Sequence, residues 1–470
     1  MTVSPCRANL LLDQKELYQF LSACQQDCSC NQTKFVSISL EIESVDPLVV
    51  FEKTAQPNHL NFYFENKSKR RAIAAIDSVA KLHLKGKQRF ENAQKFIKLH
   101  IANTITFGNL NHSFSGPHFC CSFGFFDQNT QPNSPFPPAT VFLPRWQIIR
   151  DSDRCILIAN LEINTGINLE TLLGQFYQTI EEISSVKDNF NKNNINQQEF
   201  IKEAVNSIDN FEETIVSILK SIQSNHLQKI VIAHALDVIS ANPFNLFKSL
   251  NNLRRLYSNC YIFSISNGKG QNFIGASPER LISIHNQELI TDALAGSAPR
   301  GKTFIEDADL AKRLLNSEKE NHEHQVVIDF ISQRLYHLGI VPQLLAPQLR
   351  QLSNIQHLWT PISAKVPANV NPLEIVAELH PTPAVAGVPR DVACEAINRY
   401  ENFERGLYAA PLGWVDYQGN SEFIVGIRSA LIDSDRARLY AGAGIVAGSD
   451  PDKELAEIQL KLQALLKALV

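Results

Sequence analysis

Three observations predict a mixed fold of the α+β class. Strand-like segments follow one another between residues 229 and 284 and again between residues 421 and 446. Helical segments stand between these groups, the clearest at 317–335 and at the C-terminal end. The strict alternation of strand and helix that marks a parallel sheet is not seen. At 470 residues, the chain has room for about three domains or one large fold.

The first part of the chain gives weaker signals. Residues 35–42 alternate like a half-buried strand, and the aromatic run 61–64 predicts another. Residues 72–100 resemble an amphipathic helix, with Ile73 and Ile76 on one stripe. The Pro- and Asn-rich segment 127–140 predicts a loop.

An Asn-rich polar segment at 187–198 predicts a linker, followed by a helix over about 199–225. We place the boundary there. It separates a first part, 1–198, from a second part, 199–470.

The second part has sharper patterns. Its predicted strands are 229–239, 260–266, 272–284 (interrupted by Ser-Pro), 421–432 and 437–446. The last two are expected to form a hairpin through Ile432–Arg436. Ser317 and Glu320 have the spacing of a capping box at the start of a helix. Asp450 and Pro451 have the N-cap and first-turn chemistry that opens the final helix.

Charge and composition exclude several classes of protein. Lys and Arg number 44 and Asp and Glu 48, so the net charge is 44 − 48 = −4, which argues against a nucleic-acid binder. No run of 18 apolar residues predicts a membrane span, and the N-terminus lacks a signal or transit pattern. The nine cysteines are scattered, as expected for free thiols, and we predict a cytoplasmic protein. Cys24, Cys28 and Cys30 lack the second ligand pair that a zinc site needs.

Two helices carry paired carboxylates. Glu320 and Glu323 are three residues apart and share a helix face, as do Glu454 and Glu457, with Lys461 one turn further on. Together they offer the oxygen ligands that Mg²⁺ prefers. Taken alone, each pair is more often a helix cap or part of a solvated face.

Other patterns exclude familiar chemistry. His322 and His324 are two residues apart and do not share a helix face, so a zinc site is not predicted. The glycines at 442, 444 and 448 have the spacing G-x-G-x-x-x-G, one residue too long for a dinucleotide fingerprint. They offer instead bare backbone N–H groups at a strand end, suited to a carboxylate, and residues 293–301 offer a second such turn.

Several longer segments appear in a recognisable order. They are KIVIAHALDV, IGASPERLI, DALAGSAPRG, SEKENHEHQ, LHPTPAVAGVPR, ENFERGLYAAPLGWVD, FIVGIRSALI and LYAGAGIVAGSDPDKELAEIQLKL. This order resembles that of the chorismate-utilising enzymes, and most of all the isochorismate synthases. The resemblance covers roughly residues 200–470. It implies one large α/β fold of two packed antiparallel sheets with outer helices, which a variable half at 1–198 completes.

The resemblance also implies chemical roles. Lys229 matches the general base that activates water, and Glu279 matches the general acid that protonates the departing hydroxyl. Such a base must be neutral and such an acid protonated near pH 7. Glu323 and Glu457 match the Mg²⁺ ligands, supported through water by Glu320 and Glu454.

The substrate-binding groups are implied in the same way. Arg428 and Lys461 match the groups that hold the enolpyruvyl carboxylate, helped by the backbone of Gly442. Gly296 and Ser297 match the turn that accepts the ring carboxylate. His357 matches an active-site histidine.

These roles predict a Mg²⁺-dependent isomerisation of chorismate to isochorismate. Ammonia-adding relatives such as anthranilate synthases typically lack a lysine at the position of Lys229, and aminodeoxychorismate synthases carry a lysine where Ala295 stands. A salicylate synthase, which also eliminates pyruvate, is the main alternative, although such enzymes usually have Thr where Ser297 stands. We expect a monomer without a glutaminase subunit. Menaquinone, phylloquinone, siderophore and salicylate pathways all stay open.

The segments also depart from the family pattern. His234 stands where many relatives have Arg, Val385 stands where several have Leu, and the residues before His357 differ from the commoner T-L-W-H. These differences leave the details of the substrate pocket open, but not the class of enzyme.

Overall fold

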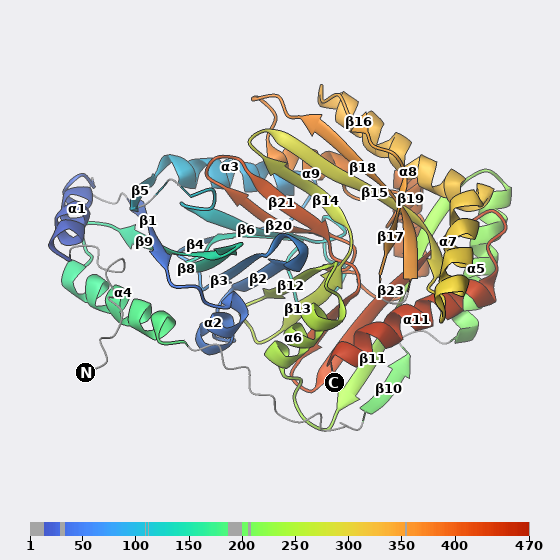
Figure 1. Ribbon diagram of the computed structural model, residues 1–470, viewed down its shortest axis with the longest axis horizontal. Helices are drawn as coiled ribbons and strands as arrows, with labels where there is room; N and C mark the ends of the chain where they lie inside the picture. Colours follow the sequence, from blue (N-terminus) through green and yellow to red (C-terminus); the bar gives the residue numbers. More distant parts are fainter. Residues whose placement is uncertain are drawn as a thin grey trace.

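Two mainly antiparallel β-sheets form the centre of the structure (Figure 1). The structure is a computed structural model that describes residues 14–28, 33–108, 110, 112–186, 200–204, 208–352 and 355–469. The larger sheet has 13 strands and the smaller has 10 within these residues. This confirms the predicted fold class. One neighbouring pair, β1 and β5, is parallel, where the family resemblance implied antiparallel sheets.

The strands of the larger sheet come from both parts of the chain. In spatial order they are β10 (Phe200–Ala204), β11 (Lys229–Ser240), β23 (Arg436–Val446), β22 (Ser429–Asp433), β13 (Asn272–Ser277), β12 (Tyr261–Ser266), β2 (Asn61–Asn66), β3 (Arg71–Ile76), β8 (Trp146–Asp151), β9 (Arg154–Ile163), β1 (Lys34–Ile42) and β5 (Thr104–Gly108), with β19 (Gly387–Val388) also paired to β11.

The strands of the smaller sheet also come from both parts of the chain. Its order is β16 (Gln343–Leu344), β18 (Ile355–Lys365), β15 (Glu288–Pro299), β14 (Arg280–His285), β21 (Ser421–Val425), β20 (Pro411–Asp416), β6 (His118–Phe123), β7 (Ala139–Leu143) and β4 (Ala80–Leu84), with β17 (Gln348–Gln351) paired to β18.

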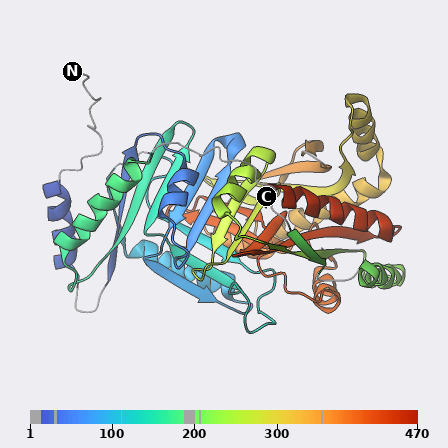
Figure 2. The ribbon, with the colours of Figure 1, turned by 90° about the horizontal axis from the view of Figure 1, so that it is seen from below.

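Helices cover both sheets. Those that contact the larger sheet are α1 (Gln14–Gln26), α2 (Pro47–Thr54), α5 (Ile208–Gln223), α6 (Leu246–Leu256), α10 (Arg390–Tyr400) and α11 (Pro451–Leu469), and α4 (Leu169–Ser184) lies beside α1. Those that contact the smaller sheet are α3 (Arg89–Ala102), α7 (Phe304–Asn316), α8 (Glu318–His337) and α9 (Pro372–Leu379). A 3₁₀ turn, Lys67–Lys69, joins β2 to β3. Figure 2 shows α1 and α4 at one end of the molecule and α7 and α11 towards the other.

Two neighbouring segments carry the chain from one sheet to the other. Pro278 and Glu279 connect β13 of the larger sheet to β14 of the smaller one, and residues 426–428 connect β21 of the smaller sheet to β22 of the larger one. The two connections lie side by side, because the Ala276 N–H donates to the Arg428 carbonyl oxygen at 3.1 Å and the Val425 N–H to that of Glu279 at 3.1 Å. The predicted strand 421–432 is therefore two strands in different sheets, whereas the predicted hairpin is confirmed by the pairing of β22 with β23.

Two helix predictions were wrong. Residues 72–100 form β3, β4 and then α3, because the apolar stripe at 73–76 belongs to a strand buried on both faces. The helix expected from residue 199 begins at Ile208, after the short strand β10. The linker expected at 187–198 and Cys30 lie outside the described residues, so the boundary between the two parts stays a prediction.

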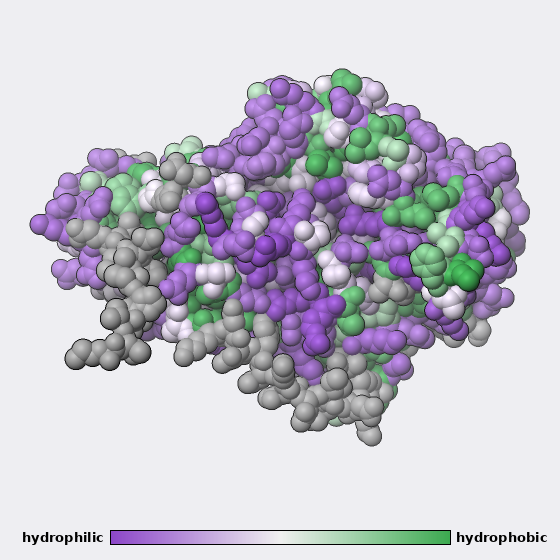
Figure 3. All heavy atoms as spheres, viewed as in Figure 1, coloured by the Kyte–Doolittle hydropathy of each residue, from purple (hydrophilic) through white to green (hydrophobic). Residues whose placement is uncertain are grey.

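The buried apolar residues form one continuous cluster that runs through both sheets and both parts of the chain. On the face shown in Figure 3, polar side chains predominate and apolar ones form scattered patches. None of the helices in the described ranges is long and apolar enough to cross a bilayer. The cysteines described all have free thiols, as predicted.

Candidate active site

A cavity lies between the sheets, where β11 and β23 face β15 and where α8 and α11 approach it. Its lining residues are numbered from 229 to 461. Ten of the twelve residues assigned from the family resemblance line it: Lys229, Glu279, Gly296, Ser297, Glu323, His357, Arg428, Gly442, Glu457 and Lys461. The structure therefore brings together residues that are up to 232 positions apart (461 − 229). Their roles stay predictions.

Lys229 opens β11 with its side chain in the cavity, and it is only 3% exposed. Its Nζ lies 2.6 Å from Oε1 of Glu323 on α8. Burial alone would raise the pKa of Glu323, but the Lys229 ammonium holds that pKa below its usual value. Gly444, on the neighbouring strand, makes room for this pair, since a Cβ there would lie 3.2 Å from Glu323 Oε1 and 3.3 Å from Lys229 Cε.

Glu279 sits in the connection between the sheets and is 4% exposed. Burial, followed by the negative charge of Asp292, raises the pKa of Glu279 to about 8, against the opposing effects of Lys229 and Arg350. A carboxyl group with this pKa is mostly protonated at neutral pH. It has the protonation state that a general acid requires.

Gly296 and Ser297 form a β-bulge inside β15, where the register against β18 shifts between Ala295 and Ser297. The prediction of a turn at Gly296 and Ser297 is therefore wrong. Gly296 has φ +76, and a Cβ there would approach the backbone oxygen of Glu320 to 3.2 Å, so glycine suits this position. The bulge turns the Ser297 N–H towards α8, where it donates to Oε2 of Glu320 at 3.0 Å.

His357 and Arg428 form the wall next to this bulge. The Nδ1 atom of His357 lies 2.9 Å from the Ser297 Oγ, and its Nε2 lies 3.4 Å from Nη2 of Arg428. Burial and then the charge of Arg428 hold the pKa of His357 well below its usual value. Arginine can only donate, so Nε2 is the acceptor and Nδ1 carries the proton of a neutral ring.

Lys461 and Glu457, on α11, lie across the cavity from β15. The Lys461 Nζ lies 2.7 Å from Oε1 of Glu457 and donates to the carbonyl oxygen of Gly442 at 2.7 Å. Gly442 is in the middle of β23, paired with Ala233, and not at a strand end as predicted. The Gly442 carbonyl oxygen accepts from Lys461 and orients it. The sequence had predicted instead that the Gly442 N–H would be free to bind a carboxylate.

The four carboxylates of α8 and α11 affect one another. Burial and then Glu323 raise the pKa of Glu320, and burial raises the pKa of Glu454 with a further contribution from Glu457. Glu320 does not complete the capping box, because its carboxylate accepts from Ser297 while only the Ser317 Oγ caps the helix. Within the described residues, no three carboxylate, thiol or imidazole groups converge tightly enough to enclose a metal ion by themselves.

Sequence reasoning missed several supporting residues. Tyr408 and Tyr440 stack with ring centroids 5.2 Å apart and line the cavity. Arg405 and Glu401 form a fully buried pair, in which Glu401 accepts from the Ala233 N–H at 2.8 Å and Arg405 donates to the Val231 carbonyl at 2.8 Å. The pair fixes β11, and its only sequence signal was its position in ENFERGLY.

The departures from the family pattern are placed differently. Val385 lines the cavity, so this difference lies in the pocket wall. His234 does not line the cavity. Its ring contacts Phe211 of α5 at 5.8 Å between centroids, so this difference lies outside the pocket wall.

Comparison with known proteins gives consistent matches over nearly the whole chain. The family model "Chorismate binding enzyme" matches residues 19–470. The salicylate biosynthesis isochorismate synthase of Pseudomonas aeruginosa is 31% identical over 463 residues, covering 96% of this chain and 93% of the relative. The isochorismate synthase MenF of Bacillus subtilis is 30% identical over 466 residues, covering 96% and 97%.

Solved structures agree with these matches. The menaquinone-specific isochorismate synthase MenF of Escherichia coli superposes with a TM-score of 0.78 at 26% identity, covering 97% of this chain and 98% of the other. Component I of anthranilate synthase from Streptococcus pneumoniae shares the fold, with a TM-score of 0.70 at 20% identity over 84% of this chain and 92% of the other.

Proposed function

The chain belongs to the chorismate-binding enzyme family, and we propose on that premise that it is an isochorismate synthase. The observation that carries the proposal is the placement of Lys229 and Glu279 in one cavity, on separate elements, together with cationic groups for an anionic substrate. Chorismate has two carboxylates and a hydroxyl that must leave. Its conversion therefore needs a base to activate water, an acid to protonate the departing hydroxyl, and cations to bind the carboxylates.

Glu279 supplies the acid. Hydroxide is a poor leaving group, and a buried carboxyl group with its pKa near 8 can protonate the departing oxygen as the C4–O bond breaks. On the other side of the ring, water forms a bond to C2 and gives its proton to Lys229, while the ring double bonds shift. The hydroxyl leaves as water, so one water enters and one departs.

Lys229 must be neutral to accept that proton. Its Nζ lies 2.6 Å from Oε1 of Glu323, so the two side chains are coupled. Glu323 matches a metal ligand of the family, and Mg²⁺ bound there would draw its carboxylate away from Lys229.

We propose Mg²⁺ as the cofactor, held by Glu323 and Glu457 with Glu320 and Glu454 behind them. An all-oxygen donor set suits this ion, and Mg²⁺ keeps several waters, so it does not need a closed protein cage. Burial raises the pKa of Glu320 and Glu454, with further contributions from Glu323 and Glu457, and a divalent cation held by these carboxylates would offset their repulsion. When bound, Mg²⁺ neutralises and orients the ring carboxylate of the substrate.

Arg428 and Lys461 balance the remaining substrate charge. Both line the cavity, and Lys461 is oriented by the Gly442 carbonyl at 2.7 Å. The acidic net charge of the protein is therefore compatible with a dianionic substrate, because the positive charge is local. A water nucleophile needs no ammonia, so we propose that the enzyme acts without a glutaminase subunit.

Product analysis tests the proposal. The purified protein is incubated with chorismate and Mg²⁺, with and without ammonium, and the products are separated by chromatography. Isochorismate as the main product, abolished by EDTA and restored by Mg²⁺, supports the assignment. Salicylate with pyruvate would favour the salicylate synthase alternative, and anthranilate formed only with ammonium would contradict water addition.

A further inference from the structure

A second buried carboxylate lies next to Glu279 and has no part in the reaction described above. Asp292 is on β15 and its side chain is 1% exposed. Its Oδ1 accepts from Nη2 of Arg280 at 2.7 Å and from Nε1 of Trp359 at 2.9 Å. Asp292 is therefore held in place from two strands, and it cannot turn away from its neighbours without breaking both bonds.

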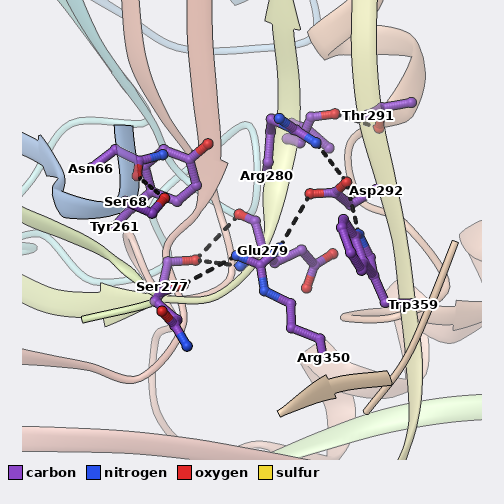
Figure 4. Close-up of polar contacts among 12 residues, drawn as sticks. Asn66, Ser68, Tyr261, Ser277, Glu279, Arg280, Thr291, Asp292, Arg350 and Trp359 are labelled. Carbon is purple, nitrogen blue, oxygen red and sulfur yellow. Dashed lines mark hydrogen bonds and ion pairs between the residues drawn. The ribbon is translucent and has the colours of Figure 1, made fainter. Parts of the chain in front are cut away.

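Arg350 interacts electrostatically with both Asp292 and Glu279. Its Nη1 is 3.7 Å from Oδ2 of Asp292, and its guanidinium lies over the Trp359 ring at 5.5 Å from the centroid. Figure 4 shows Glu279, Arg350 and Asp292 side by side, with Arg280 and Trp359 bonded to Asp292. Oδ2 of Asp292 has no hydrogen-bond partner in the described residues, so its charge acts on Arg350 and Glu279 through space.

The charged and titratable groups that act on Glu279 come from several elements. They are Lys229 on β11, Asp292 on β15, Arg350 on β17 and Tyr408 before β20. Asp292 is the only carboxylate among these neighbours. Without it, Glu279 would face Lys229 and Arg350, two cations that both favour its ionised form.

We propose that Asp292 is a positioning residue for catalysis: held in place by Arg280 and Trp359, it attracts Arg350 and places a negative charge near Glu279, and so keeps that acid protonated. The inference rests on the proposed function, in which Glu279 is the general acid. Asp292 itself does not line the cavity. Its effect is on the pH range in which the acid is competent.

The test is the pH profile of kcat/KM for chorismate. In Asp292→Asn the alkaline limb, where Glu279 loses its proton, should move to lower pH by about one unit. In Arg350→Gln it should move to higher pH, because a cation beside Glu279 is lost. In Asp292→Glu, which keeps the negative charge, the alkaline limb should lie closer to that of the wild type than it does in Asp292→Asn. A purely structural role predicts lower rates at all pH values with no shift.

Asp416→Asn is the matched control. Asp416 is a buried carboxylate in the same sheet, hydrogen-bonded by Asn420 at 2.7 Å, and it does not line the cavity. Its loss should leave the alkaline limb unchanged. Coincident limbs in wild type and a folded Asp292→Asn would overturn the proposal. Where Asp292→Asn does not fold, an unshifted limb in Arg350→Gln overturns it equally.

A spectroscopic measurement separates this inference from the proposed function. The C=O stretch of the protonated Glu279 is isolated as the infrared difference between wild type and Glu279→Gln, and it is followed with pH without any turnover. If no isochorismate forms but the band disappears at lower pH in Asp292→Asn, the proposed function fails and the coupling stands. If isochorismate forms and the band does not shift, only the coupling fails.

Discussion

Residues 14–186 and residues 208–469 build the same two sheets, but the cavity is lined only from the later part. The earlier part supplies six strands to the larger sheet (β1, β2, β3, β5, β8 and β9) and three to the smaller one (β4, β6 and β7). All the residues that line the cavity are numbered 229 or higher. A framework strand needs apolar side chains that fill space, whereas a reacting group needs one residue type at one place.

The earlier part supports the site indirectly. The guanidinium of Arg405 lies 4.3 Å from the centroid of the Phe125 ring, and the Phe125 carbonyl oxygen is 3.1 Å from Nε2 of His380. Arg405 in turn bonds the backbone of β11 beside Lys229. The comparison therefore predicts that changes in the later part affect chemistry and changes in the earlier part affect stability.

The largest expected effect is on turnover. Lys229→Met and Glu279→Gln should each lower kcat by about 10²- to 10⁴-fold, since each removes one proton-transfer group. Initial rates of isochorismate formation measure the loss, and thermal unfolding checks that the fold is retained. Arg438→Gln removes a cation from the same strand pair outside the cavity, and its rate should stay near that of the wild type. Turnover near the wild-type rate in either active-site variant contradicts the assigned role.

A core substitution in the earlier part should give the opposite result. Phe119 on β6 is fully buried, so Phe119→Ala should lower the free energy of unfolding by about 3–5 kcal/mol. Urea denaturation measures this loss. The kcat of the folded fraction should not change. A tenfold fall in kcat under conditions where the variant is folded would break the separation between framework and chemistry.

The sequence predicted the later part better than the earlier part for the same physical reason. Lys229, Glu279 and Arg428 stand in segments whose chemistry restricts the residue type, so their order was recognisable. The stripe at 73–76 satisfies a helix and a buried strand equally well, and the choice is made by partners in β2 and β8 that are distant in sequence.

Other features could not be predicted because they depend on contacts across the fold. No local pattern predicts that the chain passes from one sheet to the other at residues 426–428, between β21 and β22. The bulge at Gly296 depends on the register against β18, and Asp292 acts on Glu279 and Arg350 only because the fold brings these residues together. The proposed reacting groups could be assigned from sequence segments, whereas the groups that surround them depend on the fold.

The pH dependence of stability gives a smaller effect, linked to Glu279. Its pKa is raised from 4.5 to about 8 on folding, so between these values the native state binds more protons than the unfolded state. Its contribution to stability is complete below about pH 4.5 and is lost as the pH rises to about 8. Glu279→Gln removes this dependence. As the pH rises from about 4.5 to about 8, its free energy of unfolding should therefore increase relative to that of the wild type.

Urea denaturation at several pH values measures that gain. Asp416→Asn provides the comparison, because burial raises the pKa of Asp416 only from 3.8 to about 6. Its gain over the wild type should be complete near pH 6, while that of Glu279→Gln continues to grow towards pH 8. Parallel stability curves for wild type and Glu279→Gln would show that Glu279 is not held protonated by the fold.

The smallest effects come from two glycines in the left-handed region, one in each part. Gly86 has φ +84 with open space around it, and Gly296 has φ +76 with three atoms at 3.2 Å from an added Cβ. Substitution by Ala should cost each about 1–2 kcal/mol of unfolding free energy, because the backbone strain is the same. Only Gly296→Ala should also raise the KM for chorismate, since its Cβ pushes against Glu320 and displaces the Ser297 N–H. An equal KM in both variants would show that the bulge does not contribute to substrate binding and has only a structural role, like the strands of the earlier part.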